Sequence, residues 1–345
     1  MDLKRQPGLS KPRGAIVMLA ALVLTVFLSG LLTACEKPRS DNAAGQNQAR
    51  FRMTTRAIVT GVPKDAKVLD IWMPYPQNRE HQLITDIKVK SPYPVEVNHE
   101  KEFGNAILHA RVENPRKDFE ISIDFGVKRA ENLLDKPNKT PGADVKDAGE
   151  FKNYMRYDKV GSLTPLLQGQ ADRLTRGKKG NIAKAKAIYD YMAKTYIYDY
   201  DKKNLPTIRG DLSVFCQTKK GRCTELSTLF GTLARAAGIP VRYVSGYTLR
   251  NHDSGEVGGH CCWDEFWAPG YGWIPADLAT AKKFPQDTDY YFGNTDEWRV
   301  ELVTGRDLVL EPPQKGPRIN AWIDPYAEAD GVPFAVGKRI SWVKG

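Results

Sequence analysis

The chain has 345 residues, of which 41% are hydrophobic, 10% aromatic and 27% charged, which is typical of a globular protein with room for two or three domains. Its formal charge of +10 would suit acidic partners, but solubility is the simpler interpretation of this charge. The sequence has no basic stripe interleaved with aromatic residues and no nucleic-acid-binding motif, so we expect no nucleic acid among its partners.

The N-terminus has the pattern of a secretory signal. Basic residues precede an apolar run over Ala15–Leu28, and this run is short for a membrane span. The sequence L-T-A-C that ends at Cys35 resembles the bacterial lipobox. That resemblance implies removal of residues 1–34 and lipidation of Cys35, with an uncleaved membrane anchor as the alternative. We therefore expect a protein of the bacterial cell envelope, anchored by its lipid on the periplasmic side. Glu36, directly after the cysteine, slightly favours the outer membrane.

Residues 35–50 are small and polar, which predicts a flexible tether after the lipidated cysteine. Residues 51–150 are then rich in short β-type runs, with Pro, Asn and Gly between them. Short strands at this spacing predict a β-sandwich-like domain. The runs are Val68–Pro74, Ile84–Val89, Ala106–Val112 and Phe119–Phe125.

Helical patterns follow a linker rich in Pro, Lys and Asp over Asn132–Asp144. Asn181–Tyr196 predicts a helix with Asn181 as its N-cap. The best-defined helix starts at Cys223 and ends before Pro240, with Gly238 as its C-cap. Its apolar stripe consists of Leu226, Leu229, Phe230, Leu233 and Ala237.

A predicted antiparallel sheet follows this helix. Val241–Tyr247 has the pattern of a strand, and Asn251–Gly259 that of a polar loop. Two further strand-like runs lie between His260 and Asp277, joined by A-P-G-Y-G. We expect a core domain over residues 151–285 and a β-type or irregular C-terminal extension over 286–345.

Cys223 has the surroundings of a reactive thiol. It is expected at the helix start, directly after the basic stretch Lys219–Arg222. Free N–H groups and the positive end of the helix dipole favour an anion there, and nearby cations act in the same sense. Such surroundings lower a thiol pKa, and the same N–H groups can stabilise an oxyanion. The alternative is a small buried cysteine in a core helix.

A cysteine nucleophile needs a base and a carboxylate that orients the base. His260 and Asp277 bracket the predicted hairpin, whose two strands would bring them together. His252, on the preceding loop, is a second candidate base. Gln217 precedes Cys223 by six residues and is a candidate oxyanion donor.

These segments resemble the bacterial transglutaminase-like family, whose core is similar to papain-type cysteine proteases. The resemblance lies in G-R-C at the helix start, A-R-A-A-G-I-P-V-R at its end, and W-D-E followed by G-W-I-P-A-D. It implies an α+β fold, in which a papain-like transglutaminase core packs the cysteine-bearing helix on an antiparallel sheet and follows a β-sandwich-like domain. It also implies Cys223 as nucleophile, His260 as base and Asp277 as orienting carboxylate. Weaker similarity extends over Asp289–Val300, Gly305–Gln314 and Asp324–Gly331.

The base is one residue out of place relative to that family, where His stands two residues before the strand Trp. Here that position is Cys261, and His260 lies three residues before Trp263. Because strand side chains alternate, His260 would point away from the face that Cys261 and Trp263 share. A bulge or a late strand start would return His260 toward Cys223, and the preceding Gly pair favours this interpretation. Otherwise the site is inactive, since a thiol cannot replace imidazole as a base.

The cysteines leave two further interpretations open. A zinc site would use Cys216, Cys223, His260, Cys261 and Cys262, but the closely spaced ligand pairs typical of zinc are missing. A Cys216–Cys223 disulfide would mask the nucleophile. The sequence has no P-loop, dinucleotide-binding or HExxH motif, and we expect neither a metal nor another cofactor.

The expected function is thiol acyl transfer on amide bonds of a protein or peptide. Water would resolve the thioester in a protease or amidase, and an amine would do so in a transglutaminase. The alternative is a catalytically inactive transglutaminase-like module that binds or scaffolds partners in the envelope.

Overall fold

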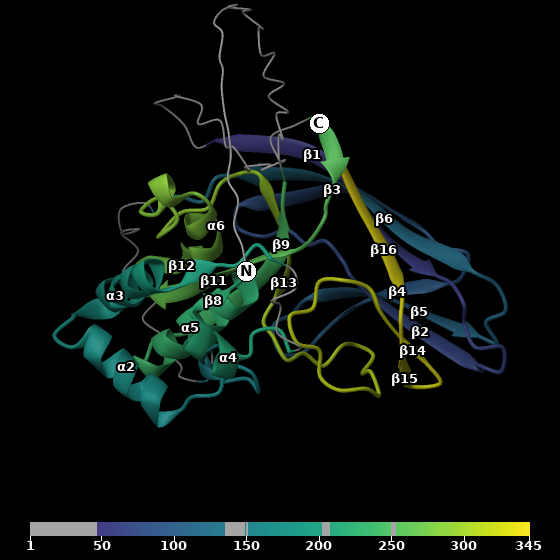
Figure 1. Ribbon diagram of the computed structural model, residues 1–345. Coiled ribbons are helices and arrows are strands. Elements are labelled where there is room, and N and C mark those ends of the chain that lie inside the picture. Colours follow the sequence, from purple (N-terminus) through teal and green to yellow (C-terminus); the bar gives the residue numbers. More distant parts are fainter. Residues whose placement is uncertain (1–46, 135–148, 150, 202–207, 250–252) are drawn as a thin grey trace, which may run out of the picture. The chain divides into compact units, whose positions relative to one another are not determined.

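The computed structural model describes residues 47–134, 149, 151–201, 208–249 and 253–345 (Figure 1). The predicted signal segment, Cys35, most of the predicted tether and His252 lie outside the described residues. Residues 48–50 of that tether belong to the first strand, so the prediction of a tether is wrong for them. Among the described residues, no helix is both long and apolar enough to cross a membrane.

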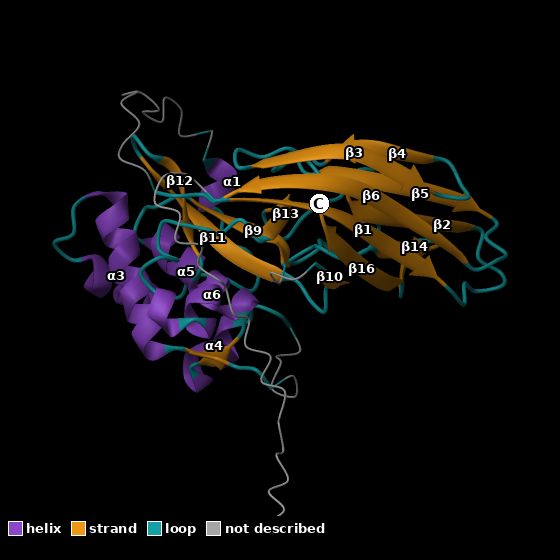
Figure 2. Ribbon diagram, turned by 90° about the horizontal axis from the view of Figure 1, so that it is seen from above, coloured by secondary structure: helices purple, strands orange, loops and turns teal. Residues whose placement is uncertain are grey.

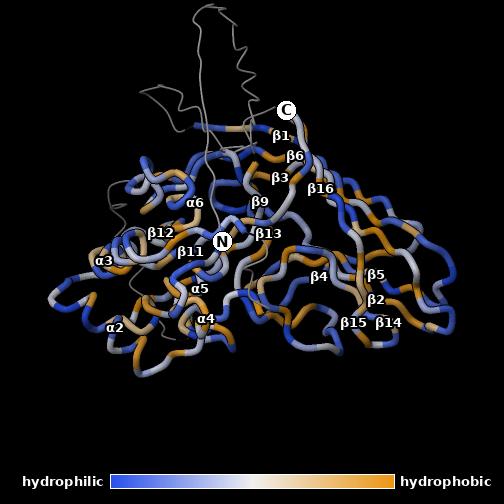
Figure 3. The backbone as a smooth tube through the Cα atoms, viewed as in Figure 1, coloured by the Kyte–Doolittle hydropathy of each residue, from blue (hydrophilic) through white to orange (hydrophobic). Residues whose placement is uncertain are grey.

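Two five-stranded antiparallel sheets share one apolar core and form a β-sandwich. In β1 (Gln48–Val59) and β6 (Phe119–Ala130), buried residues alternate with more exposed ones, because only one face of each strand meets the core. Figure 3 shows hydrophobic and hydrophilic stretches following one another along the strands of the sandwich. The first sheet has the order β10–β16–β1–β6–β3, with β3 at Gln82–Lys90, β10 at Ser254–Glu256 and β16 at Gly337–Lys344. The second has the order β15–β14–β2–β5–β4, with β2 at Val68–Pro74, β4 at Val95–His99, β5 at Ala106–Glu113, β14 at Tyr326–Ala329 and β15 at Val332–Phe334.

The C-terminal segment, for which the sequence predicts a β-type or irregular extension over residues 286–345, adds strands to both of these sheets. β16 lies between β1 and β10, and β14 pairs with β2. Each addition satisfies the hydrogen-bonding groups of a strand that would otherwise be an edge. Strand periodicity shows which residues form a strand but not which strand it pairs with, so the sequence pattern missed this arrangement.

A third, four-stranded sheet has the order β12–β11–β9–β13. Its strands are β9 (Val241–Thr248), β11 (Cys261–Ala268), β12 (Gly272–Ala276) and β13 (Arg299–Thr304). Figure 2 shows α3, α4, α5 and α6 gathered on one side of this sheet and the sandwich on the other, with the short α1 apart from the other helices, beside β12 and the sandwich. The helices are α1 (Lys152–Met155), α2 (Pro165–Thr175), α3 (Gly180–Thr195), α4 (Leu212–Thr218), α5 (Cys223–Ala236) and α6 (Leu278–Lys283). A parallel pair, β7 (Ile197–Tyr198) and β8 (Lys220–Gly221), precedes α5.

Helix α5 is the central helix of the core. It ends in a Schellman motif, in which the amide of Ile239 donates to Ala234 O at 2.9 Å and Gly238 adopts a φ of +82°. Residues 223–234 are all buried, so burial extends well beyond the predicted apolar stripe. The predicted fold class, α+β with a cysteine-bearing helix on an antiparallel sheet beside a β-sandwich, is confirmed.

The start of α3 differs from its prediction. The helix begins at Gly180, with Lys179 at the N-cap position, so Asn181 is not the cap. The Asn181 side-chain amide instead donates to Trp267 O at 2.8 Å. The Asn181 side chain, which the local sequence pattern assigns to capping, therefore makes a tertiary contact instead.

Candidate functional site

Cys223 is the first residue of α5, and the main chain around it is held from several sides. Arg222 stands at the N-cap, and its backbone amide donates to the Glu225 carboxylate at 2.8 Å. The Arg222 guanidinium donates to the main-chain oxygens of Asp199 and Tyr200. These bonds fasten the helix start to the segment after β7, and they leave Cys223 at the positive end of the helix dipole.

The pKa of the Cys223 thiol lies well below its usual range. The largest cause is a hydrogen bond with the Cys262 thiol. Burial acts in the opposite sense, and a hydrogen bond and charge from His260, together with the Lys283 ammonium, lower the pKa further. The arrangement therefore favours a thiolate at this position, which is the reactive form of cysteine.

His260 lies directly before β11, and the structure brings it to Cys223. The strand begins only at Cys261, which pairs with Gly246 of β9. His260 is therefore outside the pairing that imposes alternation of faces, and its ring interacts with the Cys223 sulfur. Its Nε2 is buried without a hydrogen-bond partner in the described part of the chain.

Cys261 lies among the charged groups around the site. Burial and the neighbouring Asp277 carboxylate raise the pKa of its thiol to about 12, although Lys283 acts in the opposite sense. At neutral pH Cys261 is therefore a neutral thiol. It has no capacity to act as a base there.

Asp277 does not bond to His260 in the described structure. It caps α6, where Oδ1 accepts from Thr280 N at 2.8 Å and Oδ2 accepts from the Thr280 hydroxyl at 2.7 Å. Oδ2 also accepts from Arg299 Nη1 at 2.9 Å, and neither of these two side chains is exposed to solvent. The structure thus brings Cys223 and His260 together and engages Asp277 with other partners.

Lys283 and Tyr198 belong to the site, and the sequence analysis missed both. The Lys283 ammonium lies 4.7 Å from the centre of the Tyr198 ring. Burial lowers the pKa of Lys283, but the acidic groups of Cys261, Tyr198 and Cys223 outweigh burial and raise it. Lys283 is the last residue of α6, and no spacing in the sequence relates that position to Cys223.

The remaining predicted residues lie elsewhere or have other environments. Gln217 is exposed on α4, and Cys216, one residue before it, is half-buried. All four described cysteines are free thiols, so no Cys216–Cys223 disulfide is present. The described residues include no group of three or more His, Cys, Asp or Glu side chains arranged to hold a metal ion.

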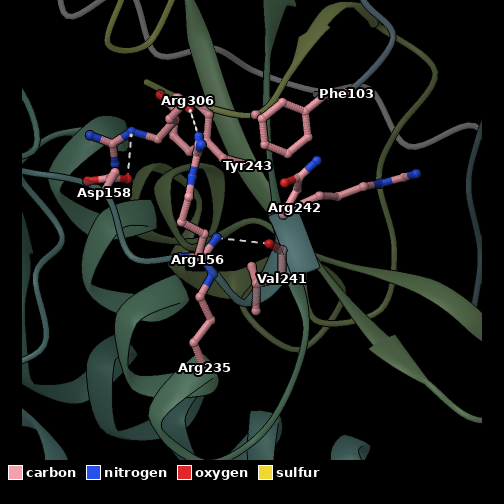
Figure 4. A pocket seen from close by; sticks show the side chains of 10 residues that line it. Phe103, Arg156, Asp158, Arg235, Val241, Arg242, Tyr243 and Arg306 are labelled. Atoms are coloured by element: carbon pink, nitrogen blue, oxygen red, sulfur yellow. Dashed lines mark hydrogen bonds and ion pairs between the residues drawn. The ribbon is translucent and has the colours of Figure 1, made fainter. Parts of the chain in front are cut away.

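A polar pocket lies near the other end of α5 (Figure 4). Arg235 donates to the main-chain oxygens of Tyr154 and Val241, each at 2.8 Å. Arg306 donates to Asn320 at 2.8 Å. These two cations therefore already have hydrogen-bond partners within the protein. The four arginines that line it are Arg156, Arg235, Arg242 and Arg306.

The family model of the transglutaminase core, described as the transglutaminase-like superfamily, matches residues 168–278. This span contains Cys223, His260 and Asp277. An uncharacterized protein of Haemophilus influenzae is 26% identical over 312 residues, which cover 79% of this chain and 84% of that protein. The uncharacterized protein YebA of Bacillus subtilis is 28% identical over 144 residues, which cover 37% of this chain and 19% of YebA.

Two solved structures match parts of this chain, and the first of them shares its fold. A proposed cysteine protease from Cytophaga hutchinsonii has a TM-score of 0.57 and 15% identity, covering 86% of this chain and 91% of its own. The periplasmic domain of TgpA from Pseudomonas aeruginosa has a TM-score of 0.38 and 16% identity, covering 70% of this chain and 90% of its own. The match of the family model and the fold shared with the first structure identify a transglutaminase-like core in this chain.

Proposed function

We propose that this protein is a cysteine-dependent acyl-transfer enzyme, with Cys223 as the nucleophile and His260 as its base. One observation carries the proposal: a thiol at the N-terminus of a buried helix has a depressed pKa and an imidazole beside it. This combination is the one that nucleophilic cysteine catalysis requires.

The proposed reaction begins with attack of the Cys223 thiolate on an amide carbonyl. The first N–H groups of α5 would stabilise the oxyanion that forms. His260 would protonate the departing amine, leaving a thioester on Cys223, and would then activate the incoming nucleophile. Water gives hydrolysis and an amine gives transamidation. Gln217 remains a predicted oxyanion donor, although its exposure on α4 lends that role no support.

In the proposed enzyme, Asp277 acts through its charge and not as a direct hydrogen-bond partner of His260. Its carboxylate oxygens accept hydrogen bonds from Thr280 and Arg299. It nevertheless raises the pKa of Cys261, and it supports the charged form of Lys283. Its assignment as the orienting member of a triad remains a prediction.

We further propose that the enzyme works in the bacterial envelope on a protein or peptide substrate, anchored by a lipid on Cys35. The support is the N-terminal sequence, with its basic start, apolar run and lipobox-like end. Detection of a lipid-modified N-terminal peptide that begins at Cys35, and its loss in Cys35→Ser, would test the anchor.

One alternative has support of its own, namely an inactive module that retains the fold for binding. Cys261 stands at the sequence position where the family has its base, and Asp277 is bonded to Arg299 instead of a histidine. Activity measurements separate the two possibilities.

The first prediction is rapid alkylation of Cys223 below the ordinary thiol pKa. Iodoacetamide at pH 6 should modify Cys223 first, because an unperturbed thiol with a pKa of ~8.5 is almost fully protonated there. Since the pKa of Cys223 is lowered, its alkylation rate should fall only when the pH drops through that lower value. Peptide mapping by mass spectrometry measures the rate at each cysteine, and Cys216, whose pKa burial raises, is the internal reference.

Measurements of substrate turnover complete this test. Release of peptides from dye-labelled casein reports hydrolysis, and incorporation of dansylcadaverine reports transamidation. Cys223→Ala should abolish both products, and His260→Ala should lower the rate by about 10²–10⁴-fold. His99→Ala, at an exposed residue of β4, is the matched control. Alkylation of Cys223 no faster than that of Cys216 would contradict the proposal, and a reactive thiol without either product would favour the binding module.

A further inference from the structure

Cys262 is a second buried thiol beside the proposed nucleophile. It is fully buried and belongs to the same apolar cluster as Cys223 and Leu226 of α5. Its sulfur lies 4.0 Å from the hydroxyl oxygen of Thr224, the residue after Cys223. The Cys262 thiol is also the largest of the causes that lower the pKa of Cys223. A strand and the start of a helix thus bring two sulfurs together.

The neighbouring Cys261 differs from Cys262 in its surroundings, although the two are adjacent in sequence. Successive residues of β11 point to opposite faces of the sheet, so Cys261 lies on the face that Trp263 shares. Its sulfur is directed toward the main-chain oxygen of Cys262, at 3.9 Å. A disulfide between these two residues would require two opposed side chains to turn toward each other. Cys262 is therefore better placed to pair with Cys223 than with Cys261.

The sulfurs of Cys223 and Cys262 differ in solvent exposure, and this difference gives them different roles. Cys223 is 5% exposed, whereas Cys262 is 0% exposed. A small oxidant from solvent therefore meets Cys223 first. Burial, followed by the contact with Cys223, also raises the pKa of Cys262, so Cys262 retains its proton while Cys223 is the thiolate that reacts.

We propose that Cys262 is the resolving thiol of Cys223 and forms a reversible Cys223–Cys262 disulfide when the site is oxidised. A hydroperoxide transfers an oxygen to the Cys223 thiolate, which becomes a sulfenic acid while the oxidant is reduced to an alcohol, or to water if it is hydrogen peroxide. The Cys262 sulfur then attacks the Cys223 sulfur. The S–S bond forms, the S–OH bond breaks, and water leaves with the Cys262 proton.

This disulfide would block the nucleophile and shield it from further oxidation to a sulfinic acid, which is not readily reversed. A dithiol would restore both cysteines by exchange. Control of activity by this bond rests on the proposed function, whereas formation of the bond does not require any turnover.

The experiment treats the purified full chain with hydrogen peroxide, blocks remaining thiols with N-ethylmaleimide, and maps tryptic peptides without reduction. Cleavage after Arg222 isolates Cys223 from the peptide that carries both Cys261 and Cys262. Wild type and Cys261→Ser should give the cross-linked pair, and dithiothreitol should release it. Cys262→Ser should lose the cross-link and accumulate Cys223 sulfinic acid. The two serine variants change neighbouring residues of one strand and are matched controls for each other.

A cross-link that persists in Cys262→Ser, or that disappears in Cys261→Ser, would overturn the proposal, as would a wild-type chain that forms sulfinic acid without any cross-link. If Cys262→Ser does not fold by circular dichroism, fragmentation of the wild-type cross-linked peptide between residues 261 and 262 identifies the bonded sulfur directly. Because mass is the readout, cross-linking in a protein without turnover would favour the binding module over the proposed enzyme and would still support the disulfide.

Discussion

At the scale of single residues, the site shows how a buried thiol can favour its anion. Burial alone raises the pKa of Cys223, because a low-dielectric environment disfavours charge. The net shift is nevertheless downward, since a thiol, an imidazole and an ammonium all stabilise the sulfur anion. These groups come from two segments: the thiol and the imidazole from residues 260–262 around the start of β11, and the ammonium from the end of α6.

We predict that Lys283→Met makes Cys223 less reactive at low pH. Removing the cation removes one of the causes that lower the pKa of Cys223, so the pH midpoint of alkylation should move upward. Lys283→Arg should move it less, because the charge is retained. The pH dependence of the iodoacetamide rate measures the midpoint.

Lys282→Met is the matched control for this change. The neighbouring Lys282 ammonium donates to the main-chain oxygen of Ala193 and is not among the groups that lower the Cys223 pKa. An equal shift in both lysine variants would show that Lys283 acts through the stability of α6 and not through its charge.

At the scale of elements, Arg299 joins β13 to the start of α6. Its guanidinium donates to Asp277 at 2.9 Å and to Asp296 at 2.7 Å, and it lies 5.0 Å from the centre of the Trp263 ring. The arginine is fully buried. A buried charge is tolerated only when it is paired, so this cluster determines how α6, with Asp277 and Lys283, meets the core sheet.

We predict that Arg299→Met destabilises the fold by about 3–5 kcal/mol, because it leaves two buried carboxylates without their cation. Urea unfolding followed by circular dichroism measures the loss. Arg339→Met is the control, since Arg339 pairs with Glu256 through side chains that are 62% and 68% exposed. Its cost should be about 0–1 kcal/mol. Equal costs would mean that the Arg299 cluster contributes no more than a surface ion pair.

At the scale of the whole molecule, the sandwich and the core are joined through shared elements. Val300 and Leu302 of β13 belong to the apolar interior of the sandwich, although β13 pairs with β9 in the four-stranded sheet of the transglutaminase-like core. Gln82 of β3 exchanges two hydrogen bonds, each of 2.9 Å, with the main chain of Glu301. We therefore expect the described part of the chain to unfold as one cooperative unit.

We predict that Trp342→Ala, in the sandwich, destabilises the distant core by the same amount. Trp342 is buried in β16 and contacts Phe51 with ring centres 6.4 Å apart, so its truncation should cost about 3–5 kcal/mol. Circular dichroism reports the sheets, and alkylation of the fully buried Cys262 reports the core. Both urea midpoints should shift together.

Val343→Ala is the matched control, because Val343 is the next residue of β16 and is 49% exposed. Its effect should lie within about 0.5 kcal/mol. If Trp342→Ala lowers the circular dichroism midpoint while Cys262 remains protected, the sandwich and the core unfold independently.

Local patterns predicted much of the fold. The strand Val68–Pro74 has the predicted bounds, and α5 begins at Cys223 as expected, because alternation and helix-end signals are encoded within a few residues. The strands added by residues 286–345 were not predicted as parts of the two sandwich sheets. Their partners lie far away in sequence, and pairing of this kind leaves no local signal.

The sequence by itself determined the helix with a thiol at its first position and the hairpin that follows it. Only the tertiary structure decided which side chains meet. Cys261 pairs with Gly246, β11 therefore starts one residue after His260, and the imidazole is free to approach Cys223. The engagement of Asp277 by Arg299, and the approach of Lys283 and Cys262, likewise depend on contacts between distant segments. The physical reason is that periodicity along a chain defines the faces of an element, whereas packing defines what each face contacts.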